Sequence, residues 1–261
     1  MNRNELANAK RVVIKVGSST LTGNAGTSLD GQAVAKLVEI VAGLKKQNKE
    51  VIIVTSAAIA AGMAPLGLVQ RPTDLATQQA AASVGQGLLI AKYTEELNKH
   101  GVVASQVLLT GDEVEDSVKR ENAQRTLFRL LELKVVPIIN ENDSVVFDEI
   151  RMGDNDRLAA LVAKIVKADL LVLVSDVDSL YDAPPSQVGA KRIPFVLSLD
   201  ELADAKIGGV GTSGVGSGGM VTKIQAAQIA TSNGTAMLLT DLVSLKAALS
   251  GEDLGTIFSA N

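Results

Sequence analysis

The chain has 261 residues, which allows one large α/β domain or two small ones. It contains no cysteine and a single histidine, which excludes disulfides and a cysteine nucleophile and argues against a histidine triad or a two-histidine metal site. Its net charge of −4, with dispersed lysines and arginines, argues against a nucleic-acid surface. Since no signal core and no run of roughly 18–20 apolar residues is present, we expect a cytoplasmic protein without a membrane partner.

Short runs of β-branched and aliphatic residues recur along the chain and predict strands. In chain order they are VVIKV (12–16), VIIVT (51–55), VVASQVLLT (102–110), VVPIIN (135–140), LLVLVS (170–175) and AMLLT (236–240). Helical patterns, with apolar residues three and four positions apart, lie between most of them, at 32–47, 74–99 and 156–168. This alternation predicts right-handed crossovers and a mostly parallel sheet with helices on both faces.

No composition shift or repeat marks a second domain, so we expect a single domain over residues 1–261. The segment DAPPSQVGAK (182–191) is predicted to be a surface loop, because its two prolines cannot join a β-ladder. His100 follows the polar tail of the helical pattern at 74–99, and we expect it to lie in solvent.

Polar and glycine-bearing residues follow the predicted strands at the ends where ligands bind in open parallel sheets. Lys15 precedes Gly17 at the end of the first strand and is either a fixed cation for a ligand or a solvated turn residue. After the second strand, Ser56 opens the small-residue stretch SAAIAAG (56–62). That stretch either exposes backbone amides to a ligand or allows two helices to pack closely.

Three further groups of polar residues belong to the same edge. NEND (140–143) ends the fourth strand, GDND (153–156) opens a helix, and Ser175 and Asp176 end the fifth strand. An N-cap explains one polar residue at the start of a helix, but not the whole of GDND. We therefore interpret these groups as candidates for ligand binding.

The glycine-rich stretch GVGTSGVGSGGMVTK (209–223) has three possible interpretations: a dinucleotide fingerprint, a phosphate-binding loop or a plain linker. Residues 214–219 match G-x-G-x-x-G, but no strand precedes them, as that fingerprint requires. The glycines lead into a helical pattern with apolar residues at 221, 224, 227 and 230. Backbone amides at a helix N-terminus bind anions, and Lys223 would add a full charge, so phosphate binding is favoured.

The combination of two lysines, Lys15 and Lys223, with several carboxylates at strand ends suits phosphoryl transfer. That reaction depends on positioning and charge neutralisation more than on a covalent nucleophile. If the acceptor is a carboxylate, it is already ionised at pH 7 and needs no general base.

The motifs KVGSST, VTSAAIAAG, VVPIINENDSV, GDNDRLAALVA, LLVLVSDVDSLY and GSGGMVTKIQAAQIA, in this order and spacing, resemble the amino acid kinase family. The resemblance runs from about residue 10 to the end of the chain. It implies a three-layer αβα sandwich with a mostly parallel central sheet, and a form without the C-terminal PUA domain that many members carry. It also implies ATP as the phosphoryl donor, with Mg²⁺ bridging phosphates rather than held by protein ligands of its own.

The resemblance also assigns roles to residues of this chain. Lys15 and Lys223 would contact the transferring phosphoryl group, and Asp156 would hold these lysines in place. Ser56, Asp143 and Asn155 would bind the substrate. The ATP-binding set would be Lys15, Ser175, Asp176, Ser217, Gly218, Gly219, Met220, Val221, Thr222 and Lys223.

The function that the resemblance favours is phosphorylation of the γ-carboxylate of L-glutamate to L-glutamyl 5-phosphate, the first step of proline biosynthesis. The alternatives are a kinase for another carboxylate, such as N-acetylglutamate, and a non-catalytic nucleotide or amino-acid sensor. The resemblance further implies a homodimer or homotetramer and inhibition by proline. This sequence departs from the family pattern at Ala57 and Ser179, where glycine is common, and at Ser217, where threonine is common.

Overall fold

The computed structural model describes residues 2–23, 26–145, 155–202 and 219–260. In these ranges the chain forms an eight-stranded sheet with the strand order β3-β4-β2-β1-β5-β9-β10-β8, in which only the β9–β10 pair is antiparallel. Its strands are β1 (Arg11–Val16), β2 (Glu50–Val54), β3 (Ala104–Leu109), β4 (Val136–Glu141), β5 (Leu170–Ser175), β8 (Phe195–Val196), β9 (Ala236–Asp241) and β10 (Thr256–Phe258). A separate two-stranded hairpin pairs β6 (Leu180–Tyr181) with β7 (Arg192–Ile193).

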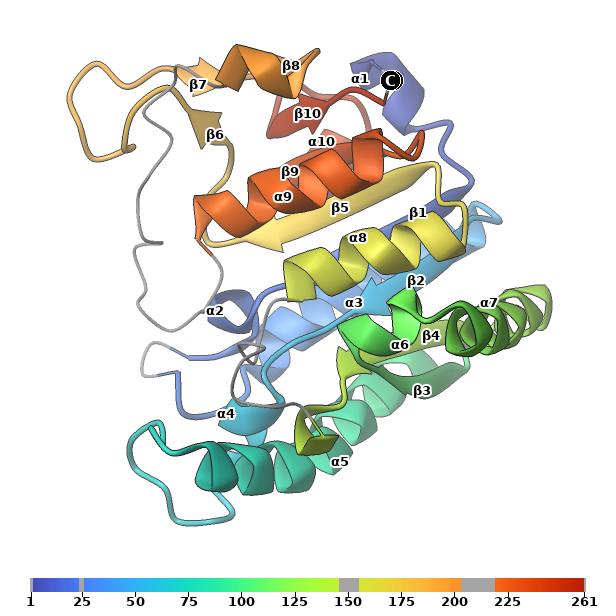
Figure 1. The fold of residues 1–261 in the computed structure, drawn as a ribbon, viewed down its shortest axis with the longest axis vertical. Helices are drawn as coiled ribbons and strands as arrows, with labels where there is room; N and C mark the ends of the chain where they lie inside the picture. The colour runs from blue at the N-terminus through green and yellow to red at the C-terminus, as the bar shows by residue number, and fades with distance from the viewer. Residues whose placement is uncertain (1, 24–25, 146–154, 203–218, 261) are drawn as a thin grey trace.

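Helices cover both faces of the sheet, which confirms the predicted αβα sandwich (Figure 1). One face carries α1 (Arg3–Leu6), α2 (Ser18–Leu21), α3 (Gly31–Lys46), α4 (Ala58–Met63), α5 (Leu75–Asn98) and α10 (Leu245–Leu249). The other carries α6 (Gly111–Glu115), α7 (Ser117–Glu132), α8 (Asn155–Ile165) and α9 (Met220–Thr231). Two 3₁₀ turns, η1 (Asp143–Val145) and η2 (Leu199–Leu202), follow β4 and β8.

The alternation of side chains along β1 explains where Lys15 points. Val12, Ile14 and Val16 pack in the core beneath α3 and α5, whereas Val13 packs in the core beneath α8. Successive side chains of a strand point to opposite faces of the sheet, so Lys15 shares the face of Val13. Its ammonium group therefore faces α8 and α9.

The six predicted strands are confirmed, with ends that differ by at most two residues from those expected, and the predicted helices correspond to α3, α5, α8 and α9. The loop at 182–191 joins β6 to β7 on the surface, and His100 is exposed, as expected. Sequence patterns did not predict α7, because its residues are mostly polar and it buries only Leu127 and Leu131. In the described ranges, no helix combines the length and apolarity needed to span a membrane.

Candidate active site

The carboxyl ends of β1, β2, β4 and β5 lie at one edge of the sheet because these strands are parallel neighbours. Figure 1 shows α2, α4 and the first turns of α8 and α9 at this same edge. The predicted site residues in the described ranges end or follow these strands, or lie at the start of α8 and α9: Lys15, Ser56, Asp143, Asn155, Asp156, Ser175, Asp176 and Gly219 to Lys223. Ser217 and Gly218 lie outside the described residues.

A buried carboxylate joins the two predicted catalytic lysines. Asp156 Oδ1 lies 2.6 Å from Lys15 Nζ, and Asp156 Oδ2 lies 3.3 Å from Lys223 Nζ. Thr222 Oγ1 is 2.9 Å from Asp156 Oδ2 and also 2.9 Å from the carbonyl oxygen of Gly219. All three charged side chains are almost entirely buried. The arrangement brings together one negative and two positive charges from β1, α8 and α9.

The electrostatics of this cluster keep Asp156 ionised. Burial alone would raise the pKa of Asp156, but the charges of Lys15 and Lys223 outweigh it, together with hydrogen bonds from Lys15 and Thr222. The pKa of Asp156 is consequently held well below its usual range. The carboxylate is therefore a permanent anchor for the two ammonium groups.

A second group of buried polar residues brings Ser56 and Asn155 together. The Asn155 side-chain amide lies 2.7 Å from the carbonyl oxygen of Thr55, 2.9 Å from Ser56 Oγ and 3.1 Å from Asn140 Oδ1. Since Ser56 Oγ accepts from this amide, its own hydroxyl hydrogen can point toward a ligand. Asn140 in turn donates to Gln86 Oε1 on α5 at 2.7 Å.

Asp143 lies in a different environment from Ser56 and Asn155. It is partly buried in η1 and lines a pocket of about 290 Å³ together with Gln86 and Glu141. Burial, together with the nearby charge of Glu141, raises the pKa of Asp143 to about 7, against the opposing charge of Arg71. The structure therefore joins two of the three predicted substrate residues directly, while Asp143 lines a separate pocket, with a carboxyl group that titrates near neutrality.

The described part of the predicted ATP set lies on β5 and α9. Ser175 Oγ donates to Asp176 Oδ1 at 3.0 Å, and Asp176 is exposed beyond the end of β5. Gly219 is the N-cap of α9, and no side chain of the described residues caps this helix. The amides of the first turn of α9 are thus available for an anion, next to the Asp156 cluster.

The stretch SAAIAAG serves close packing of two helices at its far end. A Cβ added at Gly62 or at Gly85 would clash with backbone atoms of the facing helix, because α4 and α5 cross in backbone contact there. At its near end, Ala57 is the N-cap of α4 with φ 78°, a left-handed conformation that favours glycine. The departure from the family pattern at Ala57 therefore falls on a strained position.

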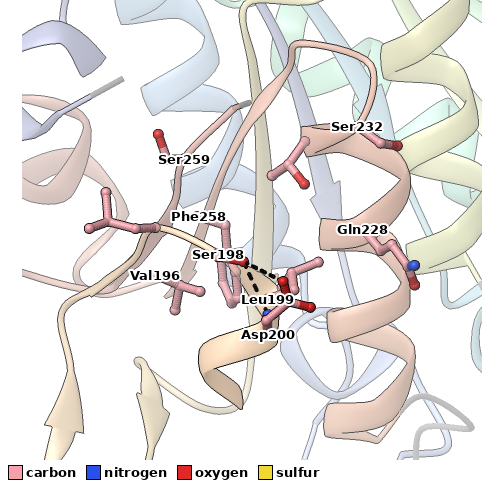
Figure 2. A pocket seen from close by; sticks show the side chains of 10 residues that line it. Val196, Ser198, Leu199, Asp200, Gln228, Ser232, Phe258 and Ser259 are labelled. Atoms are coloured by element: carbon pink, nitrogen blue, oxygen red, sulfur yellow. Dashed lines mark hydrogen bonds between the residues drawn. The ribbon is translucent and has the colours of Figure 1, made fainter. Parts of the chain in front are cut away.

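Sequence patterns missed two residues that contact this edge, Tyr93 and Gln86. The signal for Tyr93 was a lone tyrosine in a helix whose other buried positions are mostly aliphatic, because a buried tyrosine hydroxyl requires a hydrogen-bond partner. Figure 2 shows another pocket, of about 220 Å³, that contains none of the predicted site residues. There Ser198 Oγ donates to Asp200 Oδ2 and accepts from the Asp200 backbone amide, both at 3.2 Å.

The αβα fold with two lysines on one buried carboxylate suits a phosphotransferase. Residues 10–241 match the model of the amino acid kinase family, and the chain belongs to this family. It is 54% identical to "Glutamate 5-kinase" of Streptomyces coelicolor, covering 99% of this chain and 69% of that protein. It is 52% identical to "Glutamate 5-kinase" of Clavibacter michiganensis, covering 99% and 97%.

Solved structures with the same fold are much less similar in sequence. "Carbamate kinase from Giardia lamblia bound to AMP-PNP" aligns with a TM-score of 0.68 at 16% identity, over 98% of this chain and all of that chain. "UMP kinase from Ureaplasma parvum" aligns with a TM-score of 0.64 at 18% identity, over 96% and 98%. At these identities the likeness shows the fold alone.

Proposed function

We propose that the chain transfers the γ-phosphoryl group of ATP to the γ-carboxylate of L-glutamate, giving L-glutamyl 5-phosphate and ADP in the first step of proline biosynthesis. The observation that carries this proposal is the pair of buried lysines, Lys15 and Lys223, gathered on Asp156 at the carboxyl edge of the sheet. Relatives that share about half of its residues carry the name glutamate 5-kinase, which supports glutamate as the acceptor.

The lysine pair suits a reaction between two anions. A carboxylate acceptor with a pKa of about 4.3 is already ionised at pH 7, so no base has to remove a proton. The difficulty is instead the repulsion between the acceptor and the phosphates, which Lys15 and Lys223 would offset on the transferring group. Asp156 holds both ammonium groups in position before any ligand arrives.

The acceptor side favours a free amino acid. Ser56 would donate its hydroxyl hydrogen to a substrate carboxylate, and Asn155 would contact the substrate beside it. Ionised Asp143 would accept a hydrogen bond from the α-ammonium of glutamate. N-acetylglutamate has no ammonium group, so the acidic pair formed by Glu141 and Asp143 disfavours it as the acceptor.

On the donor side, ATP phosphates would lie at the first turn of α9. Ser175, Asp176 and the segment from Ser217 through Gly218, Gly219, Met220, Val221 and Thr222 to Lys223 form the proposed ATP site. Mg²⁺ would be held mainly by phosphate oxygens, since within the described residues no three carboxylate or imidazole groups come together. When bound, the ion would neutralise charge on the phosphates.

The proposal also includes a single domain over residues 1–261, a homodimer or homotetramer, inhibition by proline and a cytoplasmic location. Light scattering would test the assembly. Titration of proline into the kinase assay would test the inhibition.

Trapping of an acyl phosphate by hydroxylamine, with ATP, Mg²⁺ and a panel of carboxylic acids, tests the central reaction. We expect hydroxamate from L-glutamate and little from aspartate or N-acetylglutamate. Reaction of N-acetylglutamate without reaction of glutamate would show that the acceptor is wrong. Tight ATP binding without any turnover would point to a non-catalytic sensor.

A further inference from the structure

The hydroxyl group of Tyr93 begins a buried hydrogen-bond relay beneath the candidate substrate site. Tyr93 is fully buried on α5, and its hydroxyl lies 2.9 Å from Thr55 Oγ1. Thr55 Oγ1 in turn donates to the carbonyl oxygen of Ser56 at 3.2 Å. Because a threonine hydroxyl has one hydrogen, Tyr93 must be the donor to Thr55. Burial raises the pKa of Tyr93 well above its usual value, so the hydroxyl keeps its proton.

The segment Thr55–Ser56 is held from both faces of the sheet. Tyr93 reaches it from α5 on one face, and Asn155 reaches it from the start of α8 on the other. The Asn155 amide donates to the Thr55 carbonyl and to Ser56 Oγ, while the relay holds the Ser56 carbonyl. Thr55 is completely buried between these partners. The conformation of this segment is therefore tightly restricted. It contains the proposed substrate residue Ser56 and positions a second one, Asn155.

The relay acts on the peptide bond that precedes the strained residue Ala57. The peptide unit between Ser56 and Ala57 is planar, so the Ser56 carbonyl and the Ala57 nitrogen lie in one plane. A fixed orientation of the Ser56 carbonyl therefore restricts the φ angle of Ala57. Ala57 has φ 78°, which a residue with a Cβ adopts only when its surroundings impose it. The hydrogen bonds of Tyr93 and Thr55 supply this constraint at the Ser56 side of the turn.

We propose that Tyr93 is a positioning residue, whose buried hydroxyl holds the Ser56–Ala57 turn in its strained form and thereby keeps Ser56 and Asn155 placed for the substrate. This inference rests on the proposed function of the same site. Tyr93 does not contact the substrate in this scheme and acts through Thr55. Its effect on catalysis therefore depends on the strain at Ala57, which gives a specific test.

The test is a double-mutant cycle of Tyr93→Phe and Ala57→Gly, with the hydroxamate assay as the readout. Loss of one buried hydrogen bond should lower kcat/KM for glutamate about tenfold in Tyr93→Phe and leave KM for ATP unchanged. In the Ala57→Gly background the same change should cost about twofold or less, because glycine adopts the left-handed conformation without constraint. Thr94→Val is the matched control, since Thr94 Oγ1 on the same helix donates to the Ile90 carbonyl of its own helix.

Equal losses in both backgrounds, or no loss in Tyr93→Phe, would overturn the inference. If the unmodified chain forms no hydroxamate from glutamate, the proposed function fails, and the cycle is then read from unfolding free energies of the same four proteins. If Tyr93 holds the turn, Tyr93→Phe should lower the free energy of unfolding less in the Ala57→Gly background than in the unmodified chain. Additive free energies would overturn the inference independently of any activity.

Discussion

Lys15 and Asp156 form an ion pair of 2.6 Å between the end of β1 and the start of α8, with both side chains shielded from solvent. Two charges removed from water gain little net stability from each other, because desolvation offsets their attraction. Breaking such a pair is nevertheless costly, since one charge remains buried without its partner. The pair is better explained by function: it holds a cation at the edge of the sheet where a phosphoryl group would be transferred.

Asp156→Asn should therefore lower both turnover and stability. We expect a loss of about 3–5 kcal/mol in unfolding free energy at pH 7, because two buried lysines lose their anion. The folded-state pKa of Asp156 lies below its unfolded value, so its contribution is present above about pH 4 and is lost as the pH falls below that. Urea unfolding between pH 3 and pH 7 measures this, and an unchanged stability of the variant at pH 7 would contradict it.

Lys223→Ala should reduce turnover at least about a hundredfold, because a cation that stabilises the transferring group is removed. ATP should still bind, since the amides of α9 and the residues at the end of β5 remain. Hydroxamate formation and calorimetric ATP binding measure the two effects separately. Lys246→Ala, which changes an exposed lysine of α10, serves as the control. A normal rate in Lys223→Ala would show that Lys223 takes no part in phosphoryl transfer.

The titration of Asp143 predicts a pH dependence of substrate binding. With a pKa of about 7, Asp143 is largely protonated at pH 6 and ionised at pH 8, so KM for glutamate should fall as the pH rises through 7. Stability should show the opposite trend, because a raised folded pKa favours folding below about pH 4 and loses that contribution as the pH rises toward 7. Asp143→Asn should have a high KM without this step. A step that persists in the variant would assign it to another group.

The sequence alone located the strands and most of the residues that the structure brings together at the candidate site, and for a physical reason. Strands buried on both faces must be continuously apolar, so they stand out, and their carboxyl ends meet because they are parallel. A lysine within such a strand, Lys15, requires a partner, and the structure places Asp156 and Lys223 beside it.

Other features left little trace in the sequence. The short strands β8 and β10 depend on pairing with residues distant in the chain, and α7 has too few apolar residues for a periodic pattern. The contact of Tyr93 with Thr55 depends on how α5 lies against β2, which residue spacing does not specify. The predictions for Ser217 and Gly218 stay predictions, since both lie outside the described residues.

Two glycines of α5 should respond to alanine in opposite directions. At Gly85 a Cβ would clash with the carbonyl of Ala58 and the amide of Gly62, so Gly85→Ala should force α4 and α5 apart and cost several kcal/mol, about 3 or more. At Gly87 a Cβ would meet nothing within 4 Å, and Gly87→Ala should stabilise the helix by about 1 kcal/mol. Thermal and urea unfolding of the two variants compare them directly, and similar effects would show that the helices do not cross as described.

Ala57→Gly should stabilise the protein although it removes a buried methyl group. A left-handed alanine costs about 1–2 kcal/mol, whereas glycine adopts φ 78° at no steric cost and loses part of this gain to unfolded-state entropy. We expect the free energy of unfolding to rise by about 0.5–1 kcal/mol, measured by urea denaturation. Ala58→Gly is the control, because Ala58 begins α4 in the ordinary helical conformation and glycine there should destabilise. If both substitutions lower the free energy of unfolding equally, the left-handed conformation of Ala57 is not strained.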